Sequence, residues 1–150
     1  MNDIDFGLRL ATTQDIALVY QWQCHPNTRR FALTADIPRW PEHLSWMRQK
    51  LQSETDYFYI IEALTCAVGV VRLDHIEAMY YLVSIYIDPM QYGKGYALKA
   101  LTTLERLFPE FTLKAEVLAE NTASQQLFMK ANFIKESEQS FIREPINKGI

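Results

Sequence analysis

The sequence contains little cysteine. Cys24 and Cys66 are the only two cysteines among 150 residues, and they show neither the paired spacing of a zinc site nor the density of a secreted disulfide scaffold. We interpret both as reduced thiols and expect no metal centre. The hydrophobic fraction of 49% and the charged fraction of 22% are close to the soluble average, which argues against disordered and fibrous classes and predicts a packed core.

The sequence also lacks long apolar runs and an excess of positive charge. No apolar run reaches the length of a membrane span, and the short acidic stretch from Met1 to Phe6 has no basic region followed by an apolar core, so no signal peptide is visible. The net charge of -3 and the pI near 5.6 provide no positive field for a polyanion, which argues against nucleic acid as a partner. We therefore predict a cytoplasmic protein that acts on a small molecule and has no membrane partner.

Hydrophobic spacing divides the chain into strand and helix segments. A length of 150 residues is typical of one domain, and no linker or internal repeat interrupts it, so residues 1–150 are predicted to form a single domain. The stretch between residues 24 and 51 has room for a second and a third helix, the last with Leu44, Met47 and Leu51 at helical spacing. The remaining predicted helices cover 15–23, 94–108 and 121–131, and the predicted strands cover 6–11, 57–64, 67–73, 80–87, 112–118 and 133–142.

The order of these segments predicts the fold class. Thr65–Cys66 is the short turn of an antiparallel hairpin, and Thr12–Thr13 can cap the first helix. Leu98, Leu101, Leu104 and Leu107 give the helix over 94–108 an apolar face. The order β-α-α-β-β-β-α-β-α-β indicates an α+β protein, because it lacks the strict alternation of a doubly wound parallel sheet.

A glycine loop joins the strand that ends at Ile87 to the helix that follows it. The loop reads Tyr92-Gly93-Lys94-Gly95-Tyr96-Ala97. Glycines let the backbone turn tightly around an anion, and a helix N-terminus adds a partial positive charge, so such a junction can bind phosphate. The alternative is an ordinary strand-to-helix turn, since the spacing is too short for a Walker loop or a Rossmann fingerprint.

A second segment, Asn121 to Phe133, follows the loop helix, and together the two segments closely resemble the GNAT N-acetyltransferases. In that family the loop holds the CoA pyrophosphate and the second segment flanks the pantetheine arm. The resemblance extends back to Leu8–Arg9 and implies the GNAT fold, with a central mixed and mostly antiparallel sheet flanked by helices, and acetyl-CoA as the acetyl donor. The cofactor-binding residues that it implies here are Tyr92, Gly93, Lys94, Gly95, Tyr96, Ala97, Asn121, Ser124 and Phe128.

Three positions depart from the family pattern. Tyr92 stands where the loop usually has glutamine or arginine, but most phosphate contacts in the loop come from main-chain N–H groups, so we expect CoA binding to survive. Asn132 replaces the usual glycine, and asparagine is the next residue best able to adopt a positive φ. Phe128 stands where many relatives carry a tyrosine that protonates the departing thiolate, and phenylalanine has no proton to donate.

The middle of the chain resembles the nucleotide-sugar N-acetyltransferases of pseudaminic-acid-type sugar biosynthesis. The matching pieces include His25–Pro26 with Arg29, the segment from Glu42 to Trp46, and the segment from Val68 to Asp74. This weaker resemblance implies that the acceptor is the amino group of a UDP-linked amino sugar. Candidate substrate contacts are Arg29 and Arg30 for a diphosphate, with Trp40, His43 and Trp46 for stacking and hydroxyl contacts. Each has a structural alternative: the tryptophans as core residues, the arginines as a solvated face, and His43 as a residue near a helix N-terminus.

The resemblance also implies how acetyl transfer takes place. In the family the strand over 83–87 splays from the strand over 112–118, which leaves main-chain N–H groups free for the pantetheine amides and the thioester oxygen. Ile85, Tyr86 and Ile87 are the residues expected to supply them, with Ile85 as a catalytic backbone group. Ser84 is placed to position the acceptor amine or relay a proton, and a structural serine is the alternative. Neither cysteine falls in the matched motifs, so we expect direct attack in a ternary complex rather than an acetyl-enzyme.

Two other functions remain open at the level of sequence. One is an acetyltransferase for a protein N-terminus, a polyamine or an antibiotic. The other is a catalytically silent module that binds acetyl-CoA, which the phenylalanine at position 128 favours. Loss of a general acid costs about 100-fold or more without abolishing transfer, so we favour an enzyme. The sequence leaves a monomer and a homodimer equally open.

Overall fold

Runs of β-branched and aromatic residues form the strands of a single sheet in the computed structural model, which describes residues 5–146. The strands are β1 (Phe6–Leu10), β2 (Tyr57–Ala63), β3 (Cys66–Glu77), β4 (Tyr80–Ile87), β5 (Thr112–Glu116), β6 (Ile134–Ser137) and β7 (Ser140–Arg143). The helices are α1 (Ile16–Cys24), α2 (Pro26–Arg30), α3 (Trp40–Gln52), α4 (Tyr96–Leu107) and α5 (Thr122–Lys130), with short 3-10 turns η2 (Thr13–Asp15) and η3 (Pro89–Gln91). None of the helices within residues 5–146 is long and apolar enough to cross a membrane.

The seven strands lie in the order β1-β2-β3-β4-β5-β7-β6. All neighbouring strands are antiparallel except β4 and β5, which are parallel and are joined by the crossover through α4. The prediction of an α+β fold with a mixed, mostly antiparallel sheet is confirmed.

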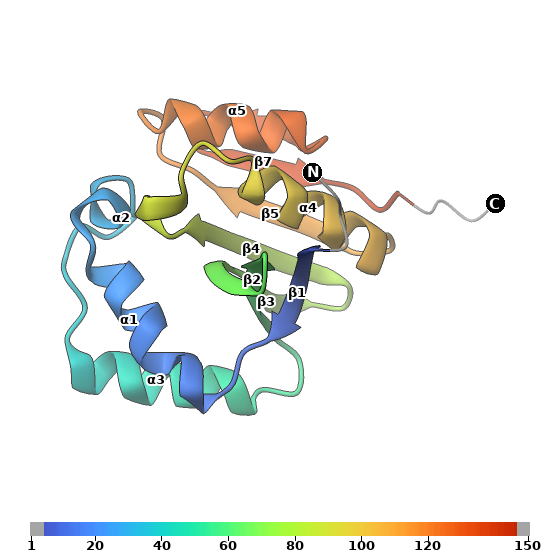
Figure 1. Ribbon diagram of the computed structural model, residues 1–150. Coiled ribbons are helices and arrows are strands. Elements are labelled where there is room, and N and C mark those ends of the chain that lie inside the picture. The colour runs from blue at the N-terminus through green and yellow to red at the C-terminus, as the bar shows by residue number, and fades with distance from the viewer. Residues whose placement is uncertain (1–4, 147–150) are drawn as a thin grey trace.

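Helices cover both faces of the sheet, with α1 and α3 on one side of the strands and α4 and α5 on the other (Figure 1). Even-numbered residues of β2 and β3, such as Ile60 and Val70, pack against Val19 and Met47 of the first helix group. Odd-numbered residues of the same strands, such as Ile61 and Val71, pack against α4 and α5. Because successive side chains alternate between faces, each strand contributes to two separate cores.

The C-terminal part of the sheet differs from the prediction. A single strand was expected over residues 133–142, but the chain forms the hairpin β6–β7, which turns at Glu138–Gln139. Every residue of β6 is exposed, so this edge strand shows no apolar alternation by which the sequence could reveal it. The earlier hairpin between β2 and β3 turns at Leu64–Thr65, which have φ of 53° and 66°, one residue before the predicted turn.

The second and third helices predicted between residues 24 and 51 form as α2 and α3. Helix α2 begins at Pro26, and the His25 side chain caps it by accepting a hydrogen bond from the Asn27 N–H at 3.1 Å. One residue of α4 differs from the prediction. Leu107 was expected on the apolar face of α4 but is 50% exposed. The buried residues of this helix are Tyr96, Ala100, Leu101 and Leu104.

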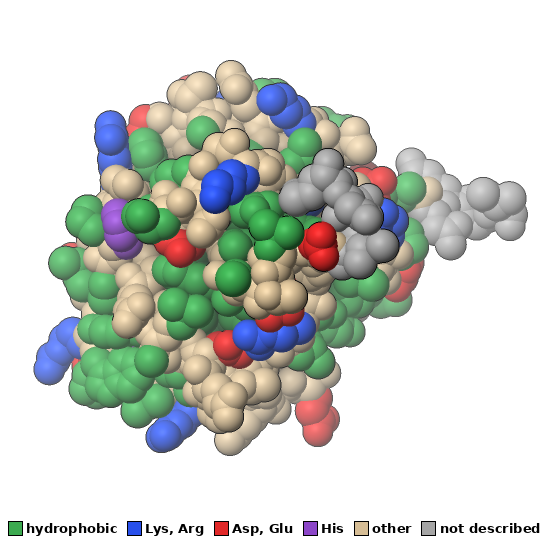
Figure 2. All heavy atoms as spheres, viewed as in Figure 1, with side chains coloured by type: hydrophobic (Ala, Val, Ile, Leu, Met, Phe, Trp, Pro, Cys, Tyr) green, Lys and Arg blue, Asp and Glu red, His purple; other side chains and the backbone are tan. Residues whose placement is uncertain are grey.

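Charged side chains of both signs are scattered over the face of the molecule that Figure 2 shows. Hydrophobic side chains gather on the part of this face that lies over α1 and α3. Leu33, Ile37 and Trp40, which lie on the loop before α3 and at its first residue, are exposed by 57%, 64% and 40%. This rim borders the cavity described below.

Candidate active site

The parallel strands β4 and β5 separate part-way along their length. Their last backbone pair is Leu82–Lys114. Beyond it β4 continues to pair with β3 as far as Ile87, and β5 continues to pair with β7 as far as Glu116. Each strand keeps its outer neighbour, so the backbone groups that face the widening gap have no strand partner there.

The hydrogen-bond pattern shows which residues of β4 face this gap. The Asp88 N–H donates to the Val68 carbonyl at 2.8 Å on the β3 side, and the Met79 carbonyl accepts from the Thr112 N–H at 2.9 Å on the β5 side. Because backbone groups alternate in direction along a strand, odd-numbered residues of β4 face β5. The N–H groups of Ile85 and Ile87 therefore point into the gap.

Tyr86 is the exception among the three predicted main-chain donors. Like Asp88, it is even-numbered, so its N–H faces its register partner Val70 of β3 and points away from the gap. Its side chain lies on the face covered by α1 and α3, where burial raises the pKa of the phenol to about 12, against the opposing effects of a hydrogen bond with Gln23 and the charge of Arg72. The structure therefore places Tyr86 beside the helices rather than in the gap.

The glycine loop enters α4 with an open, left-handed backbone. Gly93 and Gly95 both have φ of 79°, and Gly95 is the N-cap of α4 without any side-chain cap. A Cβ atom built at either glycine meets no other atom within 4 Å. The N-terminus of α4 therefore has no side-chain cap and has open space beside both glycines, and an uncapped helix N-terminus of this kind can bind phosphate through its first N–H groups.

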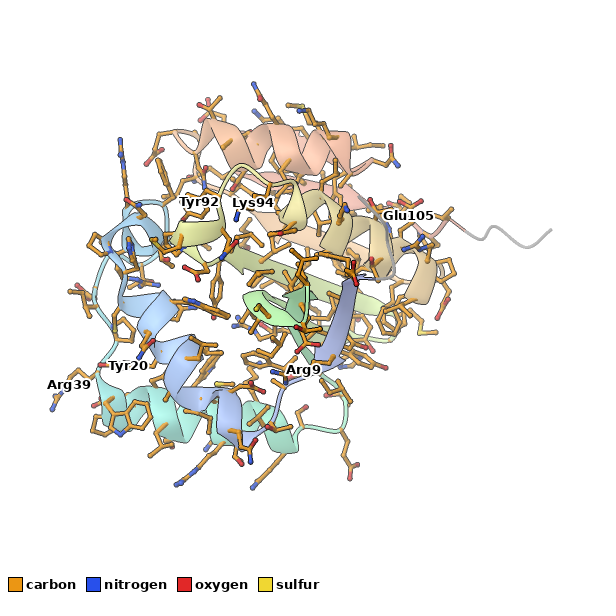
Figure 3. All side chains as sticks on the ribbon, in the orientation of Figure 1. Arg9, Tyr20, Arg39, Tyr92, Lys94 and Glu105 are labelled. Carbon is orange, nitrogen blue, oxygen red and sulfur yellow. The ribbon has the colours of Figure 1, made fainter. Side chains whose placement is uncertain are left out.

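The polar side chains of the loop lie beside this open N-terminus. Tyr92 and Lys94 project from the segment between η3 and α4 (Figure 3). Lys94 donates from Nζ to Gln91 Oε1 at 2.8 Å, and Asp88 caps η3 by accepting from the Met90 N–H at 3.0 Å. Partial burial and the Asp88 carboxylate raise the pKa of Tyr92, so its phenol is neutral near pH 7. The loop therefore offers Lys94 as its one cation.

The α5 segment is held by its own polar residues. Asn121 caps the helix, with Oδ1 accepting from the Ser124 N–H at 3.2 Å. Gln125 is buried, and its Nε2 donates to the carbonyls of Val117, Leu118 and Glu138. This amide ties α5 to the end of β5 and to the β6–β7 turn, and so fixes the far wall of the gap.

Phe128 lies inside the core that α5 covers. It is 3% exposed, contacts Phe133 edge-on at 5.0 Å between ring centroids, and stacks on Phe141 at 5.9 Å. Asn132, two residues beyond the helix, has φ of 71°, as the replacement of glycine by asparagine predicted.

A cavity lies on the other face of the sheet, under α1, α2 and α3. Its volume is about 350 Å³. Arg72 lies on its floor and connects it to β4, because the Arg72 Nη2 atom is 3.5 Å from Ser84 Oγ. The lining residues are Gln23, Arg29, Pro38, Glu42, His43, Trp46 and Arg72.

Arg29 holds the loop over residues 31–39, which joins α2 to α3. Its Nη1 donates to the carbonyls of Thr34 and Asp36 at 2.9 and 3.0 Å, and its Nη2 donates to Gln23 Oε1 at 2.6 Å. Tyr20, labelled in Figure 3, fixes the same loop by donating to the Pro38 carbonyl at 3.0 Å. Most donors of Arg29 are thereby used within the protein.

His43 and Trp46 form the α3 wall of the cavity. His43 is buried, and its Nε2 lies 3.1 Å from the Ile16 carbonyl. A carbonyl only accepts, so Nε2 carries the proton, and burial lowers the pKa of the ring despite this bond. His43 is therefore neutral near pH 7, with Nδ1 unprotonated. The ring of Trp46 covers the Arg72 guanidinium at 4.8 Å.

Comparison with known proteins identifies the family. A family model described as acetyltransferase (GNAT) domain matches residues 5–134. The chain belongs to the GNAT acetyltransferase family. It is an N-acetyltransferase that uses acetyl-CoA as its acetyl donor.

Several GNAT relatives resemble the chain over most of its length. An acetyltransferase PseH from Campylobacter jejuni is 25% identical over 125 residues, which cover 81% of this chain and 78% of that protein. The RimL ribosomal L7/L12 alpha-N-protein acetyltransferase in complex with coenzyme A has a TM-score of 0.83 at 14% identity, covering 96% of both chains. A Vibrio cholerae spermidine N-acetyltransferase, in complex with CoA and spermine, has a TM-score of 0.80 at 17% identity, covering 95% of this chain and 90% of that one. These structures share the GNAT fold.

The GNAT chain brings together only some of the residues predicted to contact the acceptor. Arg29, His43 and Trp46 line the cavity. Arg30 lies outside it and packs over Phe31 at 5.0 Å. Trp40 also lies outside and contacts Tyr20 edge-on at 5.1 Å. The prediction that these two residues contact the acceptor therefore has no support from the cavity.

Sequence reasoning about the GNAT chain also missed residues that line the cavity. Arg72 is the clearest of these, and its signal was a cation inside the otherwise apolar run from Val68 to Leu73. Gln23 and Glu42 carried no such signal, because each stands on a helix where polar residues normally face water.

Proposed function

We propose that this GNAT enzyme transfers the acetyl group of acetyl-CoA to the amino group of a UDP-linked amino-deoxy sugar. The observation that carries the proposal is the composition of the cavity beside Ser84. It contains two arginines, Arg29 and Arg72, against one carboxylate, Glu42, together with the indole of Trp46. Guanidinium groups and an aromatic face suit an acceptor with a diphosphate and rings. The similarity to PseH proteins and the resemblance of the central segments support the same acceptor.

The donor side of the proposed site is the gap between β4 and β5. The N–H groups of Ile85 and Ile87 would bind the pantetheine arm, and that of Ile85 would also stabilise the oxyanion. The open N-terminus of α4 would bind the pyrophosphate, with Tyr92, Gly93, Lys94, Gly95, Tyr96 and Ala97 as the contributing residues. Asn121 and Ser124 would flank the arm from α5.

The proposed reaction is direct transfer. The neutral amine attacks the thioester carbonyl carbon and forms the C–N bond, and collapse of the tetrahedral oxyanion breaks the C–S bond. The nitrogen loses one proton and the thiolate gains one, so an amide and a free thiol result. Ser84 would position the amine from the cavity side, since its hydroxyl lies beside Arg72. Phe128 would act as a wall without donating a proton, and a thiolate with a pKa of about 8.5 is a tolerable leaving group.

A polyamine or an aminoglycoside fits the cavity less well. Such acceptors carry several positive charges at neutral pH, and Glu42 is the single carboxylate among the seven lining residues. A protein N-terminus remains a competing acceptor, because the exposed rim formed by Leu33, Ile37 and Trp40 could contact a peptide.

A thiol-release assay with a panel of acceptors tests these alternatives. The panel holds a UDP-linked amino-deoxy sugar, the same amino sugar without UDP, spermidine, an aminoglycoside and a short peptide with a free N-terminus. We expect the highest kcat/KM for the UDP-linked sugar and a large loss when UDP is removed. A preference for spermidine or the peptide would overturn the proposed acceptor. Acetyl-CoA binding without turnover on any amine of the panel would show that the acceptor belongs to none of these classes.

A further inference from the structure

Arg72 is a charged residue in the middle of the sheet whose surroundings hold it in one place. It lies on β3 directly opposite Ser84 of β4. Its Nε donates to both carboxylate oxygens of Asp74, at 3.0 and 3.2 Å, and its guanidinium lies 4.8 Å from the Trp46 ring centroid and 6.0 Å from that of Phe58. The side chain is 15% exposed. These contacts fix the guanidinium at the cavity floor.

Asp74 does not fully neutralise the charge of Arg72, because the same carboxylate also pairs with a second cation. Lys50 of α3 donates from Nζ to Asp74 at 3.0 Å and to Asp56 at 3.1 Å. Asp56 also accepts from the His75 N–H at 2.7 Å. The result is an alternating row, Asp56–Lys50–Asp74–Arg72, whose positive end faces the cavity beside Ser84.

We propose that Arg72 is a specificity-determining residue that keeps the acceptor amine neutral. The inference rests on the proposed placement of the amine beside Ser84. A cation within about 4 to 6 Å of an amine disfavours its ammonium form and can lower its pKa by about one unit or more. Only the neutral amine has the lone pair that attacks the thioester, so the same charge that favours an anionic acceptor also raises the reactive fraction.

Among the other charged and titratable groups around Arg72, some would raise the pKa of the acceptor amine and others would lower it. Glu42 of α3 opposes its effect, but this carboxylate is largely exposed, and solvent screens it. Arg29 of α2 adds positive charge to the cavity lining, and the charges of both Arg29 and Arg72 act on Tyr86. His43 of α3 and Tyr86 of β4 are neutral near pH 7, the first because burial lowers its pKa and the second because burial raises its pKa. Arg72 is therefore a largely buried cation in contact with Ser84, where solvent screens its charge only weakly.

The test compares three variants of the full chain. Arg72→Met removes the charge but keeps an apolar stem against Trp46 and Phe58, and Asp74 keeps Lys50 as its partner, so folding should survive. Arg72→Lys keeps the charge. Arg48→Met, at an exposed position of α3, is the matched control. Thermal melts and acetyl-CoA affinity by calorimetry verify each protein.

The readout is the single-turnover rate of thiol release against pH, with the best acceptor of the panel, between about pH 5 and 10. In the parent enzyme the rate should rise with pH as the bound amine loses its proton. We expect Arg72→Met to shift this rise to higher pH by about one unit, and Arg72→Lys and Arg48→Met to leave it near its original position. A second acceptor with a different amine pKa should shift the rise by the difference between the two amines, which shows that the amine rather than a protein group titrates.

The outcomes separate this inference from the proposed function. An unchanged pH profile in a folded, active Arg72→Met protein overturns the role of Arg72, whichever acceptor is best. A best acceptor other than the UDP-linked sugar overturns the proposed substrate, while the shift in the profile would still support Arg72. Turnover on no amine overturns both.

Discussion

Leu82 of β4 and Lys114 of β5 form the last backbone pair between the two parallel strands, and the gap beyond them is bordered by the N–H groups of Ile85 and Ile87. After β4 the chain forms the short turn η3, then the glycine loop and α4. The odd-numbered residues of β4 thus present backbone donors to the gap. The Ser84 side chain of the same strand faces the cavity on the side covered by α1 and α3. The gap and the cavity therefore both require that β4 be rigid.

The anion site at the glycine loop is tested by Gly95→Asp. A carboxylate at this position would occupy the open space before α4 and place like charge at the phosphate site, so we expect acetyl-CoA binding to be lost in calorimetry. Gly95→Asn is the matched control, because asparagine tolerates the φ of 79° better than most residues and carries no charge. Unchanged affinity in a folded Gly95→Asp protein would show that the loop does not hold the pyrophosphate.

The position of β4 depends on Gly69. A Cβ atom at this residue would lie 2.5 Å from the Tyr86 carbonyl oxygen and 3.1 Å from Ile87 Cα. Gly69→Ala must therefore displace the strand, and we expect a loss of about 1 to 3 kcal/mol in the free energy of unfolding and weaker acetyl-CoA binding. Gly7→Ala meets no atom within 4 Å, so urea melts should show no loss. Equal stability of the two variants would contradict the close packing of β3 against β4.

Asn121 has a cap role that must be separated from a cofactor role. Asn121→Ala removes the acceptor for the Ser124 N–H and should cost about 0.5 to 2 kcal/mol of stability. Asn121→Ser keeps a capping hydroxyl but lacks the amide. If the amide also contacts the pantetheine arm, both variants lose acetyl-CoA affinity in calorimetry. Full affinity in Asn121→Ser would make the residue a helix cap alone.

The missing general acid is tested at Phe128. Transfer without a side-chain acid predicts that Phe128→Tyr leaves kcat unchanged or slightly raised, because the hydroxyl adds only a donor. Phe128→Ala should cost about 3 to 5 kcal/mol of stability, since it removes a ring that is 3% exposed and packs on Phe133 and Phe141. Both kcat and a thermal melt are measured for each variant. Complete inactivity of a stable Phe128→Tyr protein would show that the thioester lies elsewhere.

The ion pair between Arg9 and Asp15 makes stability depend on acid pH. Arg9 donates from Nη1 and Nη2 to the two Asp15 oxygens at 2.8 Å, and these bonds hold the pKa of the buried carboxyl below its ordinary value of 3.8, although burial opposes them. A lowered folded pKa contributes stability above about pH 4 that is lost as pH falls through the folded pKa. We expect Asp15→Asn to lower the free energy of unfolding at neutral pH. In acid, the difference in this free energy between the variant and the parent protein should become smaller.

Urea melts at neutral and acid pH measure this effect, with Glu62→Gln as the control. Glu62 accepts from Arg9 Nε at 2.8 Å but its side chain is 36% exposed, against 9% for Asp15. Its removal should therefore cost less. A gap between Asp15→Asn and the parent that stays constant with pH would contradict the lowered pKa.

Local patterns predicted much of the fold. Strand β4 was predicted with its observed bounds, since a nearly continuous run of strand-forming residues ends at Asp88–Pro89. The left-handed backbone at Gly93, Gly95 and Asn132 also follows from residue type. The β6–β7 hairpin was not predicted, because the side chains of its edge strand β6 are all exposed and show no apolar pattern. Strand β6 is held by backbone pairing with Phe141 and Ile142 of β7.

The sequence by itself determined the element order, the glycine loop before α4, the helix that begins near Asn121 and the absence of an acid at residue 128, because each depends on neighbours within a few residues. The tertiary structure decided that Tyr86 faces β3 while Ile85 and Ile87 face the gap, since that choice comes from the register of β4 against two other strands. It also decided that Arg72 reaches the cavity floor while Arg30 does not. A guanidinium is directed by the carboxylates, rings and carbonyls around it, and for Arg72 those groups come from β3, from the adjacent strands and from α3.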